Sequence, residues 1–150
     1  MIEIRESRKT DLKHLLALYT QLNNNQMPII DENLEQLWED ILSDPNHHII
    51  VGIIEEKIVS SCVLIIIKNL THNQRPYALI ENVITNEECR GKGYATAILN
   101  FAKTIAESEN CYKIMLMTGS KKESTLNFYK RAGYNDKDKT AFIQWIDKEK

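Results

Sequence analysis

Hydrophobic and polar positions in the first third of the chain follow the periods of one strand and two helices. Residues 2–6 alternate and predict a short strand. Apolar residues spaced three and four apart then predict a helix capped by Thr10, with Asp11 in its first turn; they are Leu12, Leu15, Leu16, Tyr19 and Leu22. The polar run 23–28 ends this helix. A second helix is predicted from Asp31 and stops before Pro45.

The middle of the chain changes to β-branched runs. Residues 48–55 and 58–67 predict a hairpin whose turn is Glu56-Lys57, and residues 77–85 predict a third strand of this region. Residues 94–109 then return to helical spacing, with apolar positions at Ala95, Ile98, Leu99, Ala102, Ile105 and Ala106.

The last third of the chain predicts a strand, a helix and a strand. Residues 113–118 form the first strand, and Ser120 with Glu123 has the spacing of a capping box for a helix that ends at Gly133. Residues 140–147 alternate again and predict a final strand. The chain therefore predicts an α/β (α+β) fold, a mixed sheet with helices on both faces, and its 150 residues suit a single domain.

Composition excludes several classes of protein. The chain has 19 Lys and Arg against 21 Asp and Glu, a net charge of −2, which argues against nucleic acid as a partner. Its three cysteines have neither disulfide nor zinc spacing, and the adjacent His47 and His48 would point to opposite faces of a strand, so no metal is expected. Without a signal segment or a membrane-length apolar run, we expect a cytoplasmic protein with no membrane partner.

The most informative segment passes from a strand through a glycine turn into a helix. It runs from Ile80 to Ala95, and its glycine turn is Arg90-Gly91-Lys92-Gly93-Tyr94-Ala95. Glycines let backbone N–H groups converge, and a helix start attracts anions, so a pyrophosphate is the natural ligand. The Walker A pattern is absent from the sequence, and the next strand lacks the acid that a dinucleotide site needs.

A second motif, Asn127-Phe128-Tyr129-Lys130-Arg131-Ala132-Gly133-Tyr134, follows one helix and one strand later. With the turn at residues 90–95, which fits R/Q-x-x-G-x-G/A, it resembles the GNAT superfamily of acetyl-CoA-dependent N-acetyltransferases. The resemblance implies a mostly antiparallel sheet of six to seven strands and acetyl-CoA as co-substrate. It assigns the pyrophosphate of CoA to residues 90–95 and places Tyr129 near the thioester sulfur.

Acetyl transfer to an amine needs a base, an oxyanion donor and an acid for the thiolate. Glu81 is the candidate base, against a water relay or a carboxylate paired with Lys or Arg. Tyr129 is the candidate acid, against a core residue sharing a face with Leu126 and Ala132. The resemblance implies that backbone groups of Val83, Ile84 and Thr85 hold the pantetheine arm, where their strand separates from residues 113–118. A covalent route through Cys89 is disfavoured because its sulfur would lie by the phosphates.

The acceptor pocket is the least determined part of the sequence. The fold implied by the resemblance would line it with residues 23–27 and 72–77. Candidate contacts are Asn24, Arg75, Tyr77 and Asn82. Ile80-Glu81-Asn82 resembles amino-sugar-phosphate acetyltransferases, although these usually have Asp where this chain has Asn82.

The expected function is acetyl transfer from acetyl-CoA to a primary amine of a small polar metabolite, an amino sugar or an amino acid, by direct attack. The alternatives are a non-catalytic acyl-CoA-binding module and an acetyltransferase acting on protein amines. Relatives of this kind are commonly homodimers, and the final strand is a candidate interface.

Overall fold

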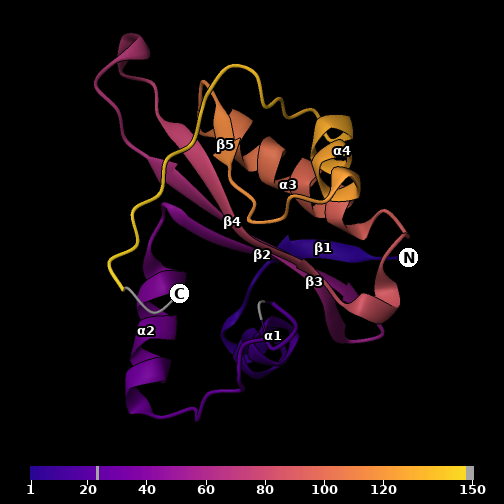
Figure 1. Cartoon of the computed structure of the whole chain (residues 1–150). Coiled ribbons are helices and arrows are strands. Elements are labelled where there is room, and N and C mark those ends of the chain that lie inside the picture. The colour runs from indigo at the N-terminus through magenta and orange to yellow at the C-terminus, as the bar shows by residue number, and fades with distance from the viewer. Residues whose placement is uncertain (23, 148–150) are drawn as a thin grey trace. The chain divides into compact units, whose positions relative to one another are not determined.

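The computed structural model describes residues 1–22 and 24–147, which divide into two units, residues 1–116 and 117–147. The structure does not fix the position of one unit relative to the other, so each is described by itself (Figure 1). The first unit contains a sheet and three α-helices, and the second contains one α-helix. The expectation of a single domain stays a prediction.

The sheet of the first unit has the strand order β1-β2-β3-β4-β5. Its strands are β1 (Glu3–Glu6), β2 (His47–Ile54), β3 (Lys57–Ile67), β4 (Tyr77–Thr85) and β5 (Ile114–Leu116). The first four pair antiparallel, and β5 pairs parallel to β4. This confirms the mixed, mostly antiparallel class, with five strands among the described residues in place of the six or seven expected.

Helices cover both faces of this sheet (Figure 1). Helices α1 (Leu12–Tyr19) and α2 (Glu32–Ser43) lie on one face, where Leu15 and Trp38 pack against Ile49 and other buried strand residues. Helix α3 (Tyr94–Ser108) lies on the other. It comes so close that a Cβ at Gly52 of β2 would be 3.3 Å from Ile98 Cδ1. The sheet is therefore the middle layer, which explains its long apolar strands.

Two sequence-based boundaries in this unit are shifted by local hydrogen bonding. Asp31 caps α2 as predicted, because its carboxylate accepts from the Leu34 N–H at 2.9 Å. Thr10 is not the cap of α1: it lies inside a short 3₁₀ turn, η1 (Lys9–Asp11), and Asp11 is the residue before the helix. The β2–β3 turn is Glu55-Glu56, both at positive φ, one residue earlier than expected.

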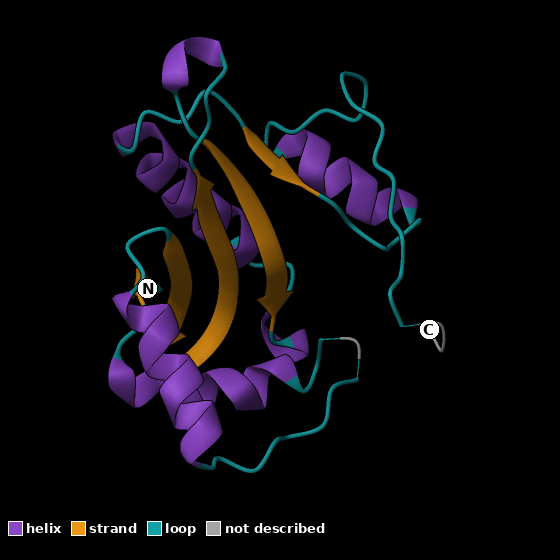
Figure 2. Cartoon of the chain, turned by 90° about the vertical axis from the view of Figure 1, so that its left-hand side faces the viewer, coloured by secondary structure: helices purple, strands orange, loops and turns teal. Residues whose placement is uncertain are grey.

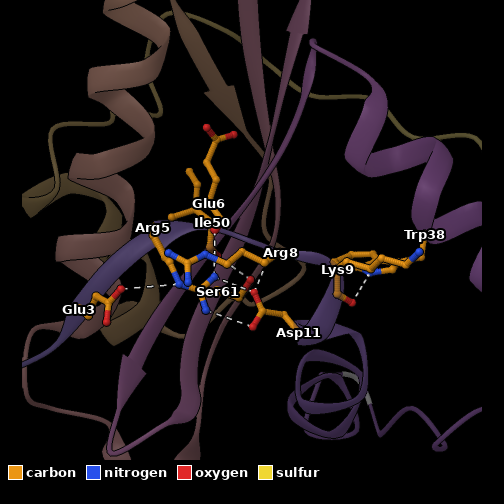
Figure 3. A network of polar contacts seen from close by, with 9 residues as sticks. All are labelled: Glu3, Arg5, Glu6, Arg8, Lys9, Asp11, Trp38, Ile50 and Ser61. Carbon is orange, nitrogen blue, oxygen red and sulfur yellow. Dashed lines mark hydrogen bonds and ion pairs between the residues drawn. The ribbon is translucent and has the colours of Figure 1, made fainter.

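Asp11 is buried because its carboxylate collects three hydrogen bonds (Figure 3). Arg5 donates two, at 2.7 and 3.1 Å, and the Arg8 backbone N–H donates the third at 2.7 Å. Burial by itself would raise the pKa of this carboxyl, but these hydrogen bonds and the arginine charges outweigh it, so the pKa lies below its ordinary value. The ion pair between Arg5 and Asp11 joins β1 to the start of α1.

Replacing Asp11 by asparagine is expected to lower the free energy of unfolding by about 2 to 3 kcal/mol at pH 7, because Arg5 loses its buried partner. A carboxyl whose folded pKa is depressed stabilises above its unfolded pKa, near pH ~4, and that contribution disappears as pH falls through the folded value. Urea titrations of Asp11→Asn and the parent protein should therefore give different free energies of unfolding at pH 7 and similar ones in acid.

Asp136 is the matched control, since its pKa is also lowered, by Lys130, but it is exposed. Asp136→Asn should leave the urea midpoint unchanged. If the free energies of unfolding of Asp11→Asn and the parent protein differed by the same amount at pH 7 and in acid, the role given to the carboxylate would be contradicted.

The second unit contains α4 (Glu123–Arg131), which ends as predicted at Gly133, where φ is +99°. The predicted capping box at its start is not formed. The residue before the helix is Lys122, while the Ser120 hydroxyl accepts from the Lys122 N–H at 3.3 Å and donates to Thr125. Ser120 therefore organises the approach to α4 as part of a turn.

The predicted final strand over residues 140–147 is wrong for the described structure, which assigns these residues no strand. The physical reason is that a strand exists only through hydrogen bonds to a neighbour, and no described strand pairs with this segment. Strand β5 is also shorter than the predicted 113–118, because its pairing with β4 covers only three residues.

Candidate active site

The centre of β4 carries a bulge. Ser61 of β3 pairs with Ile84 and Val63 pairs with Glu81, so Asn82 and Val83 together face the single residue Cys62. Asn82 has φ of +52°, a left-handed conformation that asparagine tolerates better than most residues. The side chains of Glu81 and Asn82 are both exposed, although neighbours in a regular strand alternate between faces. Bulges of this kind re-aim side chains, often next to active sites.

Beyond the bulge, β4 continues past the last residue that pairs with β5. The pairing of β4 with β5 ends at Ile80 and Leu116, whereas β4 continues to Thr85. Figure 2 shows β5 diverging from β4. Among the described strands none occupies this edge of residues 81–85, so its backbone groups are open to an extended ligand. The sheet separates at the place that the resemblance implies.

The turn after β4 presents a set of convergent backbone donors. A 3₁₀ turn, η3 (Glu87–Cys89), leads to Gly91 and Gly93, whose φ values are +75° and +81°. Within the described residues, no acceptor takes a hydrogen bond from the backbone amides of residues 90–96. A Cβ at either glycine would meet nothing within 4 Å, so the turn is open above them. Because Gly93 caps the 15-residue α3, the amides and the helix dipole favour an anion here.

Two side chains frame this turn. Arg90 donates from Nε to the Thr85 carbonyl at 3.2 Å, which ties the turn back to the end of β4. Lys92 is exposed beside it. Val83, Thr85, Tyr94 and Ala95 are half-buried and Ile84 is buried. The nine predicted cofactor-binding residues therefore form one continuous path, from the open strand edge to the start of α3.

The candidate base Glu81 lies at the head of this path. No described Lys or Arg forms an ion pair with it, so the alternative of a salt-bridged strand-edge carboxylate receives no support from the structure. Its exposed carboxylate lies next to Asn82 and four residues before Thr85. An acid placed so can take a proton from a bound amine, directly or through water.

The candidate acceptor residues are dispersed. Asn24 is exposed with φ of +53°, while Asn23 lies outside the described residues. Arg75 donates from Nε to the Asn110 carbonyl at 3.2 Å and from Nη2 to the Cys111 carbonyl at 3.3 Å. Tyr77 begins β4, with its ring edge-on to Tyr112 and Lys113 Nζ 5.1 Å from its centroid. The structure thus brings Arg75 and Tyr77 to the start of β4 and leaves Asn24 on the α1–α2 loop.

Tyr129 belongs to the second unit, and Glu81 to the first, so the structure does not fix the position of one relative to the other. Its ring lies on α4, with centroids 5.0 Å from Phe128 and 6.3 Å from Tyr134, both in edge-on contact. The residue is half-buried. These contacts fix the ring within its own unit, as a proton donor requires.

Tyr19 is a polar group that the sequence pattern identified only as part of a helix face. Its hydroxyl is buried without a hydrogen-bond partner among the described residues, and burial raises its pKa to about 12. The neighbours that influence this pKa are Ser61 and Cys62, the residues of β3 that face the bulge. Burial likewise raises the pKa of Cys62 to about 12, which makes its thiol a packing group and no nucleophile.

The described residues contain no group of three or more His, Cys, Asp or Glu side chains placed to hold a metal ion. Their helices also fall short of the length and apolar character required to cross a bilayer.

Comparison with known proteins matches residues 9–134 to the acetyltransferase (GNAT) family. Glucosamine 6-phosphate N-acetyltransferase of Arabidopsis thaliana is 27% identical over 139 residues, covering 91% of this chain and 88% of the relative. Its namesake from Trypanosoma brucei brucei is 32% identical over 78 residues, 52% of this chain and 51% of the relative.

Solved structures agree with this match. A provisionally assigned acetyltransferase of Agrobacterium tumefaciens strain C58 has a TM-score of 0.88 at 34% identity, covering 95% of this chain and 99% of that one. The crystal structure of the Arabidopsis thaliana glucosamine-6-phosphate N-acetyltransferase has a TM-score of 0.87 at 25% identity, with 98% and 99% covered. Family match, fold and glycine turn agree, and the chain therefore belongs to the GNAT family of N-acetyltransferases.

Proposed function

We propose that this protein transfers the acetyl group of acetyl-CoA to the primary amine of an amino sugar phosphate by direct attack. The observation that carries the proposal is the open edge of β4, which runs from the Asn82 bulge to the amides of residues 90–96. An extended, amide-bearing arm that ends in a diphosphate fits such a path, because strand edges bind amides and helix starts bind phosphates.

Acetyl-CoA supplies the activated acyl group, and the residues of this chain bind it and move protons. The amides of residues 90–96 hold the pyrophosphate, with Arg90 and Lys92 at the rim. Backbone groups of Val83, Ile84 and Thr85 hold the pantetheine arm. Glu81 accepts the proton that the amine loses, and Tyr129 donates one to the departing thiolate.

The choice of acceptor rests on the relatives and on Arg75. The two relatives described above are each named for glucosamine 6-phosphate. Arg75 uses two of its five N–H donors on backbone carbonyls, so three remain for an anionic group such as a sugar phosphate. Asn82 departs from the aspartate of that subfamily and removes one negative charge from the site. An acceptor with a phosphate is repelled less by asparagine than by aspartate.

The acceptor test is thiol release from acetyl-CoA across matched amines. The panel is glucosamine 6-phosphate, glucosamine, galactosamine 6-phosphate, a set of amino acids, and a lysine-containing peptide. We expect the phosphorylated amino sugars to give the highest kcat/KM, by about tenfold or more over glucosamine, because a charge-assisted hydrogen bond contributes about 1.5 kcal/mol or more. If amino acids or the peptide gave the higher kcat/KM, the acceptor would be an amino acid or a protein amine and not an amino sugar phosphate. Binding of acetyl-CoA without turnover on every amine would favour a non-catalytic module.

Glu81→Gln is expected to lower kcat about tenfold at pH 7. This loss is smaller than the full contribution of a general base, because water relays part of the proton transfer. The defect should shrink as pH rises toward the amine pKa, since the fraction of free amine grows about tenfold per pH unit. The measurement is kcat from pH 6.5 to 9.5. Glu55→Gln, on the exposed β2–β3 turn, is the control and should match the parent protein. A loss that is independent of pH would assign Glu81 to binding.

A further inference from the structure

The short turn η3 leads from the end of β4 into the glycine turn, and the core of the protein does not hold it in place. None of its three residues is buried, and Glu87 and Glu88 are exposed. The two glycines that follow, at positions 91 and 93, restrict the backbone less than any other residue would. The direction of the amides of residues 90–96 therefore depends on hydrogen bonds at the start of the turn.

The backbone N–H groups of residues 86–89 all have acceptors. Three of these hydrogen bonds stay local to the end of the sheet: Asn86 N–H donates to the Val59 carbonyl at 2.8 Å, Glu88 N–H to the Asn86 side-chain oxygen at 3.0 Å, and Cys89 N–H to the Asn86 carbonyl at 2.8 Å. The fourth spans 66 residues, because the Glu87 N–H donates to Oε1 of Gln21 at 2.9 Å. Of the four bonds, this one joins η3 directly to another element.

Gln21 extends from a well-anchored part of the chain. It follows α1 directly, and its own N–H donates to the Leu18 carbonyl at 3.1 Å. Leu18 is buried, and Tyr19 and Leu22 on either side of Gln21 pack against the same core cluster. Side chains on packed helices are held more precisely than side chains on loops. The core thus fixes the end of α1, and Gln21 connects η3 to it.

The chemistry of a glutamine suits this position. Its side-chain carbonyl accepts a hydrogen bond without adding charge. Glu87 and Glu88 already place two carboxylates next to the glycine turn, and a third would repel a diphosphate. An apolar side chain would leave the Glu87 N–H to water, which does not hold the backbone to α1.

We propose that Gln21 is a positioning residue for acetyl-CoA, whose side-chain carbonyl holds η3 so that the amides of residues 90–96 point toward the diphosphate. Gln21 acts through the Glu87 N–H. The inference rests on the proposed function, since it takes the diphosphate to bind at residues 90–96. Those amides hold the diphosphate and not the acetyl group, so loss of the Gln21 carbonyl should weaken binding of acetyl-CoA and leave the chemical step intact.

The first test is Gln21→Met, which keeps the length of the side chain and removes the acceptor oxygen. We expect the Kd of CoA, measured by calorimetry, and the KM of acetyl-CoA to rise about fivefold, the worth of one neutral hydrogen bond. The kcat at saturating acetyl-CoA should stay within about twofold of the parent protein. A lower kcat with unchanged KM, or an unchanged Kd, would overturn the proposal.

Gln36→Met is the matched control for this variant. It makes the same chemical change on the exposed face of α2, where Gln36 Nε2 donates to Asp40 at 2.9 Å. The control should bind CoA as the parent protein does, and an equal loss of affinity in both variants would contradict the role of Gln21. A parent protein that binds no CoA would overturn the proposed function, and this inference with it.

The second test removes the donor in place of the acceptor. Proline at position 87 has no N–H and suits the first residue of η3, because Asn86 before it has ψ of 131°. Glu87→Gln is the matched variant, since it loses the same charge and keeps the N–H. Adding Gln21→Met should weaken CoA binding about fivefold in Glu87→Gln and less than about twofold in Glu87→Pro. Equal effects in the two backgrounds would show that Gln21 does not act through the Glu87 N–H, and the proposal would fail.

Discussion

Gly93→Val is expected to abolish measurable binding of CoA and, with it, acetyl transfer. Gly93 has φ of +81°, and a β-branched residue is strongly disfavoured in this left-handed region. The space above the glycine is open, so the effect comes from backbone strain and not from a clash. A backbone that relaxes out of this conformation turns the neighbouring N–H groups away from the phosphates.

The expected size follows from the donors that are lost. Hydrogen bonds to a charged acceptor contribute about 1.5 to 3 kcal/mol each, so two misdirected amides weaken CoA binding by at least 100-fold. Titration calorimetry with CoA measures this loss directly. Gly133→Val is the matched control, because Gly133 has φ of +99° but closes the end of α4. It should cost stability and keep CoA affinity within about threefold. If Gly93→Val bound CoA with the affinity of the parent protein, the turn would not be the phosphate-binding site.

Tyr129→Phe is expected to lower kcat about 100-fold, the lower end of what a general acid contributes, with the affinity for CoA unchanged. Phenylalanine retains the edge-on contacts with Phe128 and Tyr134, so the helix keeps its packing and only the hydroxyl is removed. Single-turnover kinetics separates the chemical step from binding, and calorimetry with CoA gives the affinity.

Tyr112→Phe makes the same chemical change at another aromatic residue, whose ring stacks on His72 at 4.0 Å. This control should retain kcat. If Tyr129 protonates the leaving thiolate directly, a less basic thiolate depends less on this proton. The loss of kcat in Tyr129→Phe should therefore be smaller with an acyl-thioester whose thiol has a lower pKa. A Tyr129→Phe protein with the kcat of the parent would exclude Tyr129 from the mechanism.

Elements with strong local signals were predicted from the sequence to within a residue or two. The run 77–85 is β4 itself, and the run 94–109 differs from α3 by one residue, because the first is rich in apolar, strand-forming residues and helical spacing is unbroken in the second. The turn between them was predicted for the same reason: Gly91 and Gly93 permit a backbone conformation that few other residues adopt.

Features that depend on a neighbouring strand were predicted less well. The Asn82 bulge arises from the register of β4 against β3, and an asparagine within an apolar run is too weak a signal to indicate it. The separation of β4 from β5 was expected only from the family resemblance. The capping box at Ser120 has the right spacing, but the Ser120 hydroxyl is engaged within the turn instead.

The amino-acid sequence by itself determined most of the elements and the glycine turn, because these depend on periodicity and on the conformational range of single residues, and its two motifs indicated the family. Only the tertiary structure decided where β4 loses its partner, which side chains the bulge exposes, and that no described strand pairs with the alternating residues 140–147. The reason is that backbone hydrogen bonds between strands join residues far apart in the chain, and an alternating pattern specifies a strand without specifying its neighbour.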